Sequence, residues 1–226
     1  MLVLLNSQAY DQVKELILEG KLVHGTIYSE SQVAKSLGMS RTPLREALGR
    51  LRQEKIVDII PSKGFMLHKH TIEDVIETFQ VRSALEGYAA TQLARSHDTT
   101  EGRQVIQEIA GLIEKQRKIM ETSGDVNEFT SVDQEMHVIL VGFVQNDSFN
   151  ELFHNHLYRM RTFAVQSFAY PGRLDQTLQE HSDILRGLTE GNAEEVYSAV
   201  LKHMKGPVRI ISKLMSLENK PIPKGI

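Results

Sequence analysis

The sequence contains no cysteine, which excludes disulfide bonds, thiolate catalysis and thiolate metal ligation. It also lacks any apolar run long enough to span a membrane. The opening stretch MLVLL is too short for the core of a secretory signal peptide and has no charged lead. We therefore expect a soluble, cytoplasmic protein that does not associate with membranes.

The chain as a whole has no excess of positive charge, because its formal net charge is −3. The average conceals an asymmetry, because residues 1–70 contain 10 Lys and Arg against 7 Asp and Glu, whereas residues 71–226 contain 16 against 22. The length of 226 residues suffices for two modest domains. We place them at residues 1–70 and 71–226, and the positive field of the first suits the phosphates of nucleic acid.

Residues 28–57 contain the signals of two short helices and a tight turn. Ser29 and Gln32 have the spacing of a capping box, which predicts that a helix begins at Ser29. Gly38 stands where a left-handed residue would end that helix, and Ser40 would cap the second helix. The stretch is therefore predicted to be a helix-turn-helix.

The spacing of apolar residues predicts which side chains of the second helix face outward. Leu44 and Leu51 recur on one stripe and must point inward. Pro43 falls in the first turn, where its missing donor costs nothing. The outward or terminal side chains are those of Arg41, Thr42, Arg45, Arg50 and Arg52, and Arg50 is also a candidate for binding DNA. Because recognition helices present their N-terminal residues to base edges, Arg41, Thr42 and Arg45 are the candidates for base contacts.

Two short β-prone runs follow, at residues 56–60 and 65–67. The residues between them, Pro61-Ser62-Lys63-Gly64, have the composition of a turn, so the runs predict a β-hairpin wing. Wing residues hold phosphates in such domains, and Lys63 is the candidate here.

Only helix signals recur beyond Thr71. Six helices are expected, at about residues 71–95, 99–121, 124–145, 146–168, 172–190 and 192–214. A further helix at about residues 7–19 is expected to pack beneath the helix-turn-helix, and the proline-broken tail at residues 219–226 is expected to fray. The predicted fold is mainly α, with an N-terminal winged helix-turn-helix and a C-terminal antiparallel bundle of about six helices.

Four ionisable side chains fall on stripes that otherwise point into the apolar interior of the bundle. Asp133 and His137 are one helical turn apart, and His181 and His203 belong to two other helices. Each histidine alone could instead be a core residue whose ring nitrogens form hydrogen bonds within the protein. Three neutral histidines buried together, however, would leave polar nitrogens unpaired. One carboxylate and three imidazoles are a suitable set for Zn²⁺, Ni²⁺ or a similar divalent ion.

Two arginines are candidates for binding a carboxylate ligand. Arg82 and Glu86 share the inward side of the first bundle helix, one turn apart. They could form an internal salt bridge, or Arg82 could hold a ligand carboxylate by a bidentate contact. Arg161 is a second candidate for the same role.

The stretch SESQVAKSLGMSRTPLREALGRLRQEKIV resembles the winged helix of the GntR family of bacterial transcription regulators. The resemblance implies that Arg41, Thr42, Arg45 and Gly64 lie at the DNA, with Pro43 near its backbone. Some members carry an arginine where this chain has Ser31, so the resemblance implies no equivalent contact from the first helix of the motif.

The segments VRSALEGYAA, VDQEMHVIL, EHSDIL and VLKHM resemble the all-helical effector domain, called FCD, of the FadR-type branch. The resemblance is to the subgroup with an Asp-x₃-His, His, His metal site. It implies that Asp133, His137, His181 and His203 bind a metal at the floor of a cavity that takes a small organic acid.

These features predict a metabolite-responsive transcription regulator that binds a near-palindromic operator as a homodimer. A metal-dependent enzyme is the alternative from another class, although no general base is evident beside the metal ligands. A regulator whose metal has a purely structural role is the third hypothesis. The connection at residues 68–71 contains no Gly or Ser run, which predicts close coupling between the two domains.

Overall fold

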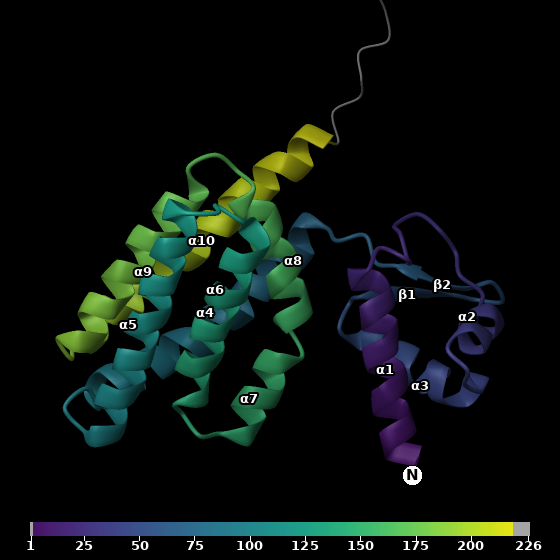
Figure 1. Cartoon of the computed structure of the whole chain (residues 1–226), viewed down its shortest axis with the longest axis horizontal. Helices are drawn as coiled ribbons and strands as arrows, with labels where there is room; N and C mark the ends of the chain where they lie inside the picture. The colour runs from purple at the N-terminus through teal and green to yellow at the C-terminus, as the bar shows by residue number, and fades with distance from the viewer. Residues whose placement is uncertain (1, 219–226) are drawn as a thin grey trace, which may run out of the picture. The chain divides into compact units, whose positions relative to one another are not determined.

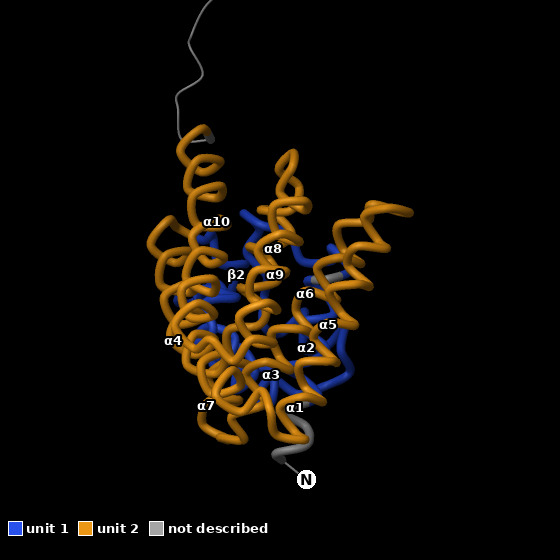
Figure 2. Tube along the Cα trace, turned by 90° about the vertical axis from the view of Figure 1, so that its left-hand side faces the viewer, with its two compact units in different colours: residues 1–70 blue, residues 71–226 orange. Residues whose placement is uncertain are grey.

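A computed structural model describes residues 2–218 of the chain. The chain divides into two compact units at the His70–Thr71 peptide bond, here called unit 1 and unit 2 (Figure 2). The described residues form ten helices and two strands, so the predicted, mainly helical fold class is confirmed (Figure 1). The tail expected to fray lies outside the described residues.

Unit 1 contains the helices α1 (Leu2–Leu18), α2 (Glu30–Ser36) and α3 (Arg41–Gln53). The first helix begins before the predicted residue 7, because the leucine-rich opening stretch favours continued helix. α1 packs on α3, and Ala9 and Val13 are fully buried, as are Leu44 and Leu51. This contact supports the helix that carries the candidate base-reading arginines.

The serines predicted to cap α2 and α3 occupy the N-cap positions, but neither side chain makes a capping hydrogen bond. The predicted capping box between Ser29 and Gln32 is therefore wrong. Gln32 is exposed, so water can satisfy the free amide groups at that helix end. Gly38 follows α2 with the predicted left-handed backbone, at φ +67°, and turns the chain toward α3.

The strands β1 (Val57–Ile60) and β2 (Gly64–Leu67) form the predicted antiparallel wing, in a register that pairs Ile60 with Gly64. The segment before α2 also joins the wing, because the Tyr28 amide donates to the Phe65 carbonyl at 2.7 Å. Gly64 has φ +132°, and a Cβ at this position would overlap the carbonyl oxygen of Tyr28. The glycine is therefore required by the packing of the wing.

Replacing Gly64 by alanine should destabilise unit 1 by about 2 kcal/mol or more, since strain at positive φ adds to this overlap. Thermal unfolding of the variant measures the loss. The control is Gly49→Ala in α3, where an added Cβ meets no atom and alanine favours the helix. An unfolding temperature of Gly64→Ala equal to that of the wild type would contradict this account.

Unit 2 is a helical bundle in which the described residues form seven helices. They are α4 (Ile72–Arg95), α5 (Thr100–Glu121), α6 (Val126–Gly142), α7 (Asp147–His154), α8 (Leu157–Phe168), α9 (Arg173–Thr189) and α10 (Ala193–Glu218). α4 begins with the predicted capping box, in which Thr71 and Asp74 bond reciprocally. The helix predicted at residues 146–168 is instead two helices, because Asn155 and His156, residue types of low helix propensity, interrupt it.

The main apolar core of unit 2 lies between α4, α5, α6, α8, α9 and α10. α10 continues through Pro207, four residues after His203. Polar side chains at the centre of this core must find partners within the protein, because water does not reach them.

Candidate metal centre and DNA-binding surface

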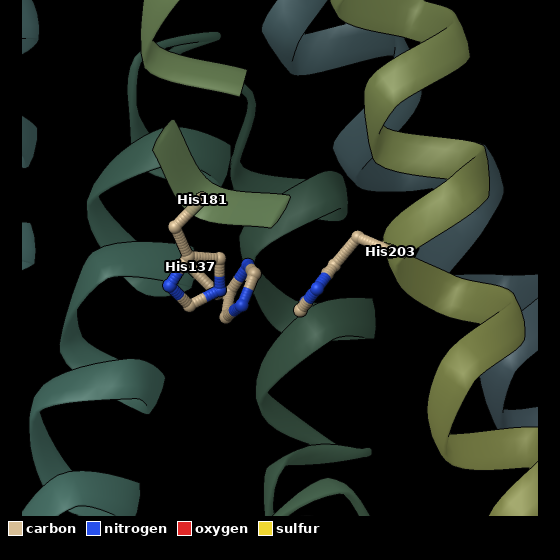
Figure 3. Close-up of side chains that lie close together, drawn as sticks. All are labelled: His137, His181 and His203. Carbon is tan, nitrogen blue, oxygen red and sulfur yellow. The ribbon is translucent and has the colours of Figure 1, made fainter. Parts of the chain in front are cut away.

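Three histidines from three helices lie close together inside unit 2 (Figure 3). His137 belongs to α6, His181 to α9 and His203 to α10, and all three are buried. Their ring centroids are 4.7 to 5.4 Å apart. One nitrogen of each ring lies within 4.8 Å of the others. The structure thus brings together the three histidines that the sequence places on separate stripes.

Asp133, one turn before His137 in α6, is buried beside the same cluster. Its Oδ1 atom is 3.4 Å from His181 Nε2 and 3.7 Å from His137 Nε2. None of these three atoms has a hydrogen-bond partner in the described part of the chain. Buried polar atoms in that state are costly, and they are the atoms that Zn²⁺ or Ni²⁺ accepts as ligands. The residues therefore fit a divalent metal ion.

The opposite nitrogens of the three rings contact acceptor groups from neighbouring helices. His181 Nδ1 bonds to Gln116 Oε1 at 2.8 Å, and His203 Nδ1 bonds to Glu180 Oε2 at 2.9 Å. His137 Nδ1 lies 2.6 Å from Glu86 Oε2. The two hydrogen bonds keep the Nδ1 protons of His181 and His203 in place and turn their Nε2 atoms toward the centre, as around ligating histidines in metal sites.

Gln116 and Glu180 belong to this site but were not predicted from the sequence. Both are polar residues on otherwise buried stripes: Gln116 follows Ile109 and Ile113 in α5, and Glu180 precedes Ile184 in α9. A search for polar positions on apolar stripes, extended from histidine and aspartate to all polar residues, would have found them.

A buried ion pair supports Glu180. Arg173 is 1% exposed, and its two terminal nitrogens donate to the two carboxylate oxygens of Glu180 at 2.9 and 2.8 Å. The guanidinium lies against Gly206, where a Cβ would come within 2.8 Å of it. A chain of contacts therefore runs from Arg173 through Glu180 to His203, and it fixes the orientation of that ring.

Loss of the Gln116 acceptor should weaken metal binding without unfolding the bundle. We expect Gln116→Leu to lower metal affinity by roughly 10- to 100-fold, because the tautomer and orientation of His181 are no longer held. Gln116→Glu keeps an acceptor and should retain most of the affinity. Competition with a chelator measures the affinity; equal values for Gln116→Leu and the wild type would exclude this role.

Arg82 and Glu86 form an internal salt bridge, which was one of the two alternatives predicted for this pair. Arg82 Nε lies 2.6 Å from Glu86 Oε1. A second guanidinium nitrogen of Arg82, Nη2, has no hydrogen-bond partner among the described residues. Arg82 lines a cavity together with Asp133, His137 and Arg161, whose own Nη1 donates to Ser131 Oγ at 3.2 Å. The cavity measures about 10 Å³, roughly the space that one water molecule needs.

The protonation of the cluster is uneven. Burial acts to lower the pKa of His137, but the carboxylates of Glu86 and Asp133 outweigh it and raise that pKa above 6.5. Burial lowers the pKa of His181 well below 6.5, and the neighbouring His203 adds to this effect. In the metal-free protein His181 is therefore a neutral imidazole at neutral pH, whereas the carboxylates around His137 favour its charged, doubly protonated form.

Metal affinity should rise with pH across the neutral range, because His137 must lose its proton before it can ligate. The gain should continue above pH 6.5, since the pKa of His137 is raised, and should end once the pH exceeds that pKa. Calorimetry in buffers of different ionisation enthalpy should show that protons are released when the ion binds. Affinity that stays flat above pH 6.5, without proton release, would contradict this protonation state.

Unit 1 contains a groove between the start of α2, the start of α3 and the wing. Arg41, Arg45, Lys63 and Gly64 are among the residues that line it, and its volume is about 270 Å³. Glu30, at the start of α2, holds both arginines, with its Oε2 atom 2.7 Å from Arg45 Nε and 3.6 Å from Arg41 Nη2. Both arginine side chains are still more than half exposed. Sequence reasoning did not assign a role to Glu30.

The other predicted DNA-binding residues lie outside this groove. Thr42 is exposed in the first turn of α3, whereas Pro43 is buried. Arg50 is exposed near the other end of α3, and its guanidinium lies 4.2 Å from the centre of the Tyr10 ring. Arg50 therefore helps to attach α1 to α3. Gly64, by contrast, lines the groove and has the packing role described above.

Comparison with known proteins gives two family matches. Residues 5–67 match the family described as bacterial regulatory proteins, gntR family, and residues 77–206 match the FCD domain. None of the helices in the described residues combines the length and apolar character that crossing a membrane requires.

Relatives of this chain are named as transcription regulators. The chain is 26% identical over 196 residues to the HTH-type transcriptional regulator YdhC of Bacillus subtilis, covering 87% of this chain and 86% of the relative. It is 29% identical over 183 residues to the Nta operon transcriptional regulator of Aminobacter aminovorans, covering 80% and 82%. The solved structure of E. coli McbR/YncC has the same fold, with a TM-score of 0.70 and 23% identity, covering 95% of this chain and 99% of that one.

Proposed function

We propose, for a chain that belongs to the GntR family of bacterial transcription regulators and carries an FCD domain, that a small organic acid at a metal in unit 2 changes the affinity for operator DNA. The chain is a DNA-binding transcription regulator; the metal, the acid and their effect on DNA are the proposal. When bound, a divalent ion such as Zn²⁺ or Ni²⁺ supplies a positive centre that accepts carboxylate oxygens.

One observation carries the proposal: the unpaired inward atoms of the histidine cluster lie beside an unpaired guanidinium nitrogen. Asp133 and His137 line the same cavity as Arg82, whose Nη2 atom has no partner in the described residues. A carboxylate that meets the metal with one oxygen can meet Arg82 with the other. Arg161 lines the same cavity and would add a second cation.

The DNA-binding surface proposed for unit 1 is the groove between α2, α3 and the wing. Arg41 and Arg45 in this groove, together with the exposed Thr42 in the same turn of α3, are assigned to base edges, and Lys63 to phosphate. Two copies of such a helix read the two halves of a near-palindromic operator, so the functional protein is proposed to be a homodimer.

Operator binding by metal-loaded and metal-stripped protein, with and without a panel of organic acids, tests the proposal. Fluorescence anisotropy of a labelled operator should change with at least one acid for the loaded protein and with none for the stripped protein. If every acid leaves the loaded protein unchanged, the metal does not anchor an effector.

A structural metal is the second candidate, and the small cavity favours it. A space of about 10 Å³ holds no organic acid unless side chains or helices move. In this case metal loading should raise the unfolding temperature, because the ion binds only the folded state. Acids should then change neither the unfolding temperature nor operator binding.

A further inference from the structure

The loop between α8 and α9 faces the later part of α10 across a pocket of about 320 Å³ (Figure 1). Residues 170–172 form the loop side, and Arg209 and Lys213, one helical turn apart, form the α10 side. Arg173, the first residue of α9, also lines the pocket. The described lining residues thus include three cations and no Asp or Glu. We call this site the basic pocket.

The two cations from α10 are not neutralised within the described part of the chain. Arg209 and Lys213 are both exposed, and neither forms an ion pair with a described carboxylate. Lys213 Nζ instead donates to the hydroxyl of Tyr170 at 3.1 Å, which holds the ammonium group at the pocket. Residues 71–226 contain 16 Lys and Arg against 22 Asp and Glu, so the pocket is a positive region on an acidic unit. It should therefore attract anions.

Two further hydrogen-bond donors of the lining residues are still free. Arg173 is 1% exposed and bonds Glu180 through its terminal nitrogens, but its Nε atom has no partner among the described residues. A buried N–H group without an acceptor is costly, and an oxygen of a bound anion would remove that cost. The Tyr170 hydroxyl accepts from Lys213, so its own hydrogen remains available for a ligand oxygen.

We propose that the basic pocket binds the phosphate group of a small metabolite. A phosphate monoester carries a charge of about −1.5 to −2 at neutral pH and three acceptor oxygens. It therefore suits three cations and a hydroxyl better than a carboxylate does, which has one charge and two oxygens. The pocket volume of about 320 Å³ is in the range of small-molecule sites and leaves room for the molecule that carries the phosphate. The proposal does not depend on a metal or an acid at the histidine cluster.

Calorimetric titration with inorganic phosphate and with glucose 6-phosphate, at constant ionic strength, tests the site. The double variant Arg209→Gln with Lys213→Gln should bind both probes roughly 100-fold more weakly than the wild type, because two charge-assisted contacts are lost. The control is Lys202→Gln with Lys205→Gln, which removes the same charge from exposed positions of α10 outside the pocket. The control should bind like the wild type.

Tyr170→Phe keeps the ring and removes only the hydroxyl, so it should weaken binding by roughly 10-fold. All variants are compared at equal metal content, so that any phosphate bound at the metal centre contributes equally to each. Their unfolding temperatures without phosphate show whether they fold like the wild type.

Glucose 6-phosphate that binds at least as tightly as inorganic phosphate supports the proposal, whereas weaker binding shows that the pocket takes only the free ion and overturns the metabolite. The site itself is overturned if the wild type shows no saturable binding of either probe. It is also overturned if the double variant in the pocket and the control pair bind phosphate equally well.

Discussion

Replacing His181 by alanine should abolish metal binding and, with it, any response of operator binding to organic acids. The side chain is fully buried, its Nε2 atom faces Asp133, and its pKa is lowered well below 6.5. It is therefore a neutral ligand already in place, and its loss should cost more than the roughly 10- to 100-fold expected for an outer partner. Unit 1 contains none of these residues, so operator binding without acid should remain.

The measurement pairs metal content, by elemental analysis, with operator affinity in the presence and absence of the acid that acts on the wild type. His203→Ala provides a second test, in case the cavity left at residue 181 disturbs folding. His154→Ala is the matched control, because that histidine is exposed on α7 and bonds only to the carbonyl of Asn150 among the described residues. A His181→Ala variant that keeps its metal, or that loses the metal and still responds to the acid, would refute the assignment.

Alanine at Arg41 or Arg45 should weaken specific operator binding by about 1 to 3 kcal/mol each, which is the range for one base contact. The effect should depend on sequence, so that binding to unrelated DNA falls less. Arg52→Ala is the control, because Arg52 is exposed on the same helix but does not line the groove. Unchanged operator affinity in both variants would remove α3 as the reading helix.

Lys63→Ala should behave differently, because a phosphate contact carries no sequence information. It should weaken all sequences equally and reduce the salt dependence by about one counterion. Glu30 complicates the arginine variants, since each one removes a cation from a carboxylate that faces the groove. Repeating the arginine variants in a Glu30→Gln background separates the lost base contact from repulsion between that carboxylate and phosphate.

The sequence predicted the helices well wherever a local signal controls a helix end. The capping box of Thr71 and Asp74 starts α4, and the left-handed Gly38 ends the first helix of the motif. The Ser29 signal was misleading, because an exposed helix start can take its hydrogen bonds from water. The break between α7 and α8 was missed because the apolar stripe continues across Asn155 and His156, although their helix propensity is low.

The three histidines and Asp133 were predicted because each lies on a stripe of apolar residues. The periodicity of the helix then places its side chain on the buried face. Their outer partners could not be predicted in the same way. The pairing of Glu180 with His203 depends on how α9 and α10 pack, over 23 positions of sequence. The same holds for Glu30, whose contact with Arg45 joins two helices across the turn of the motif. Such pairs follow from tertiary packing rather than from local spacing.

The small cavity above the histidine cluster has a kinetic consequence. Since its volume of about 10 Å³ admits no organic acid, the lining residues of α7 and α8, Phe153, Leu157 and Met160, must move before a ligand can enter. Opening then precedes binding, so the observed association rate should level off as the ligand concentration rises, at the rate of opening. Dissociation is gated by the same motion, which would give even a weak ligand a long residence time.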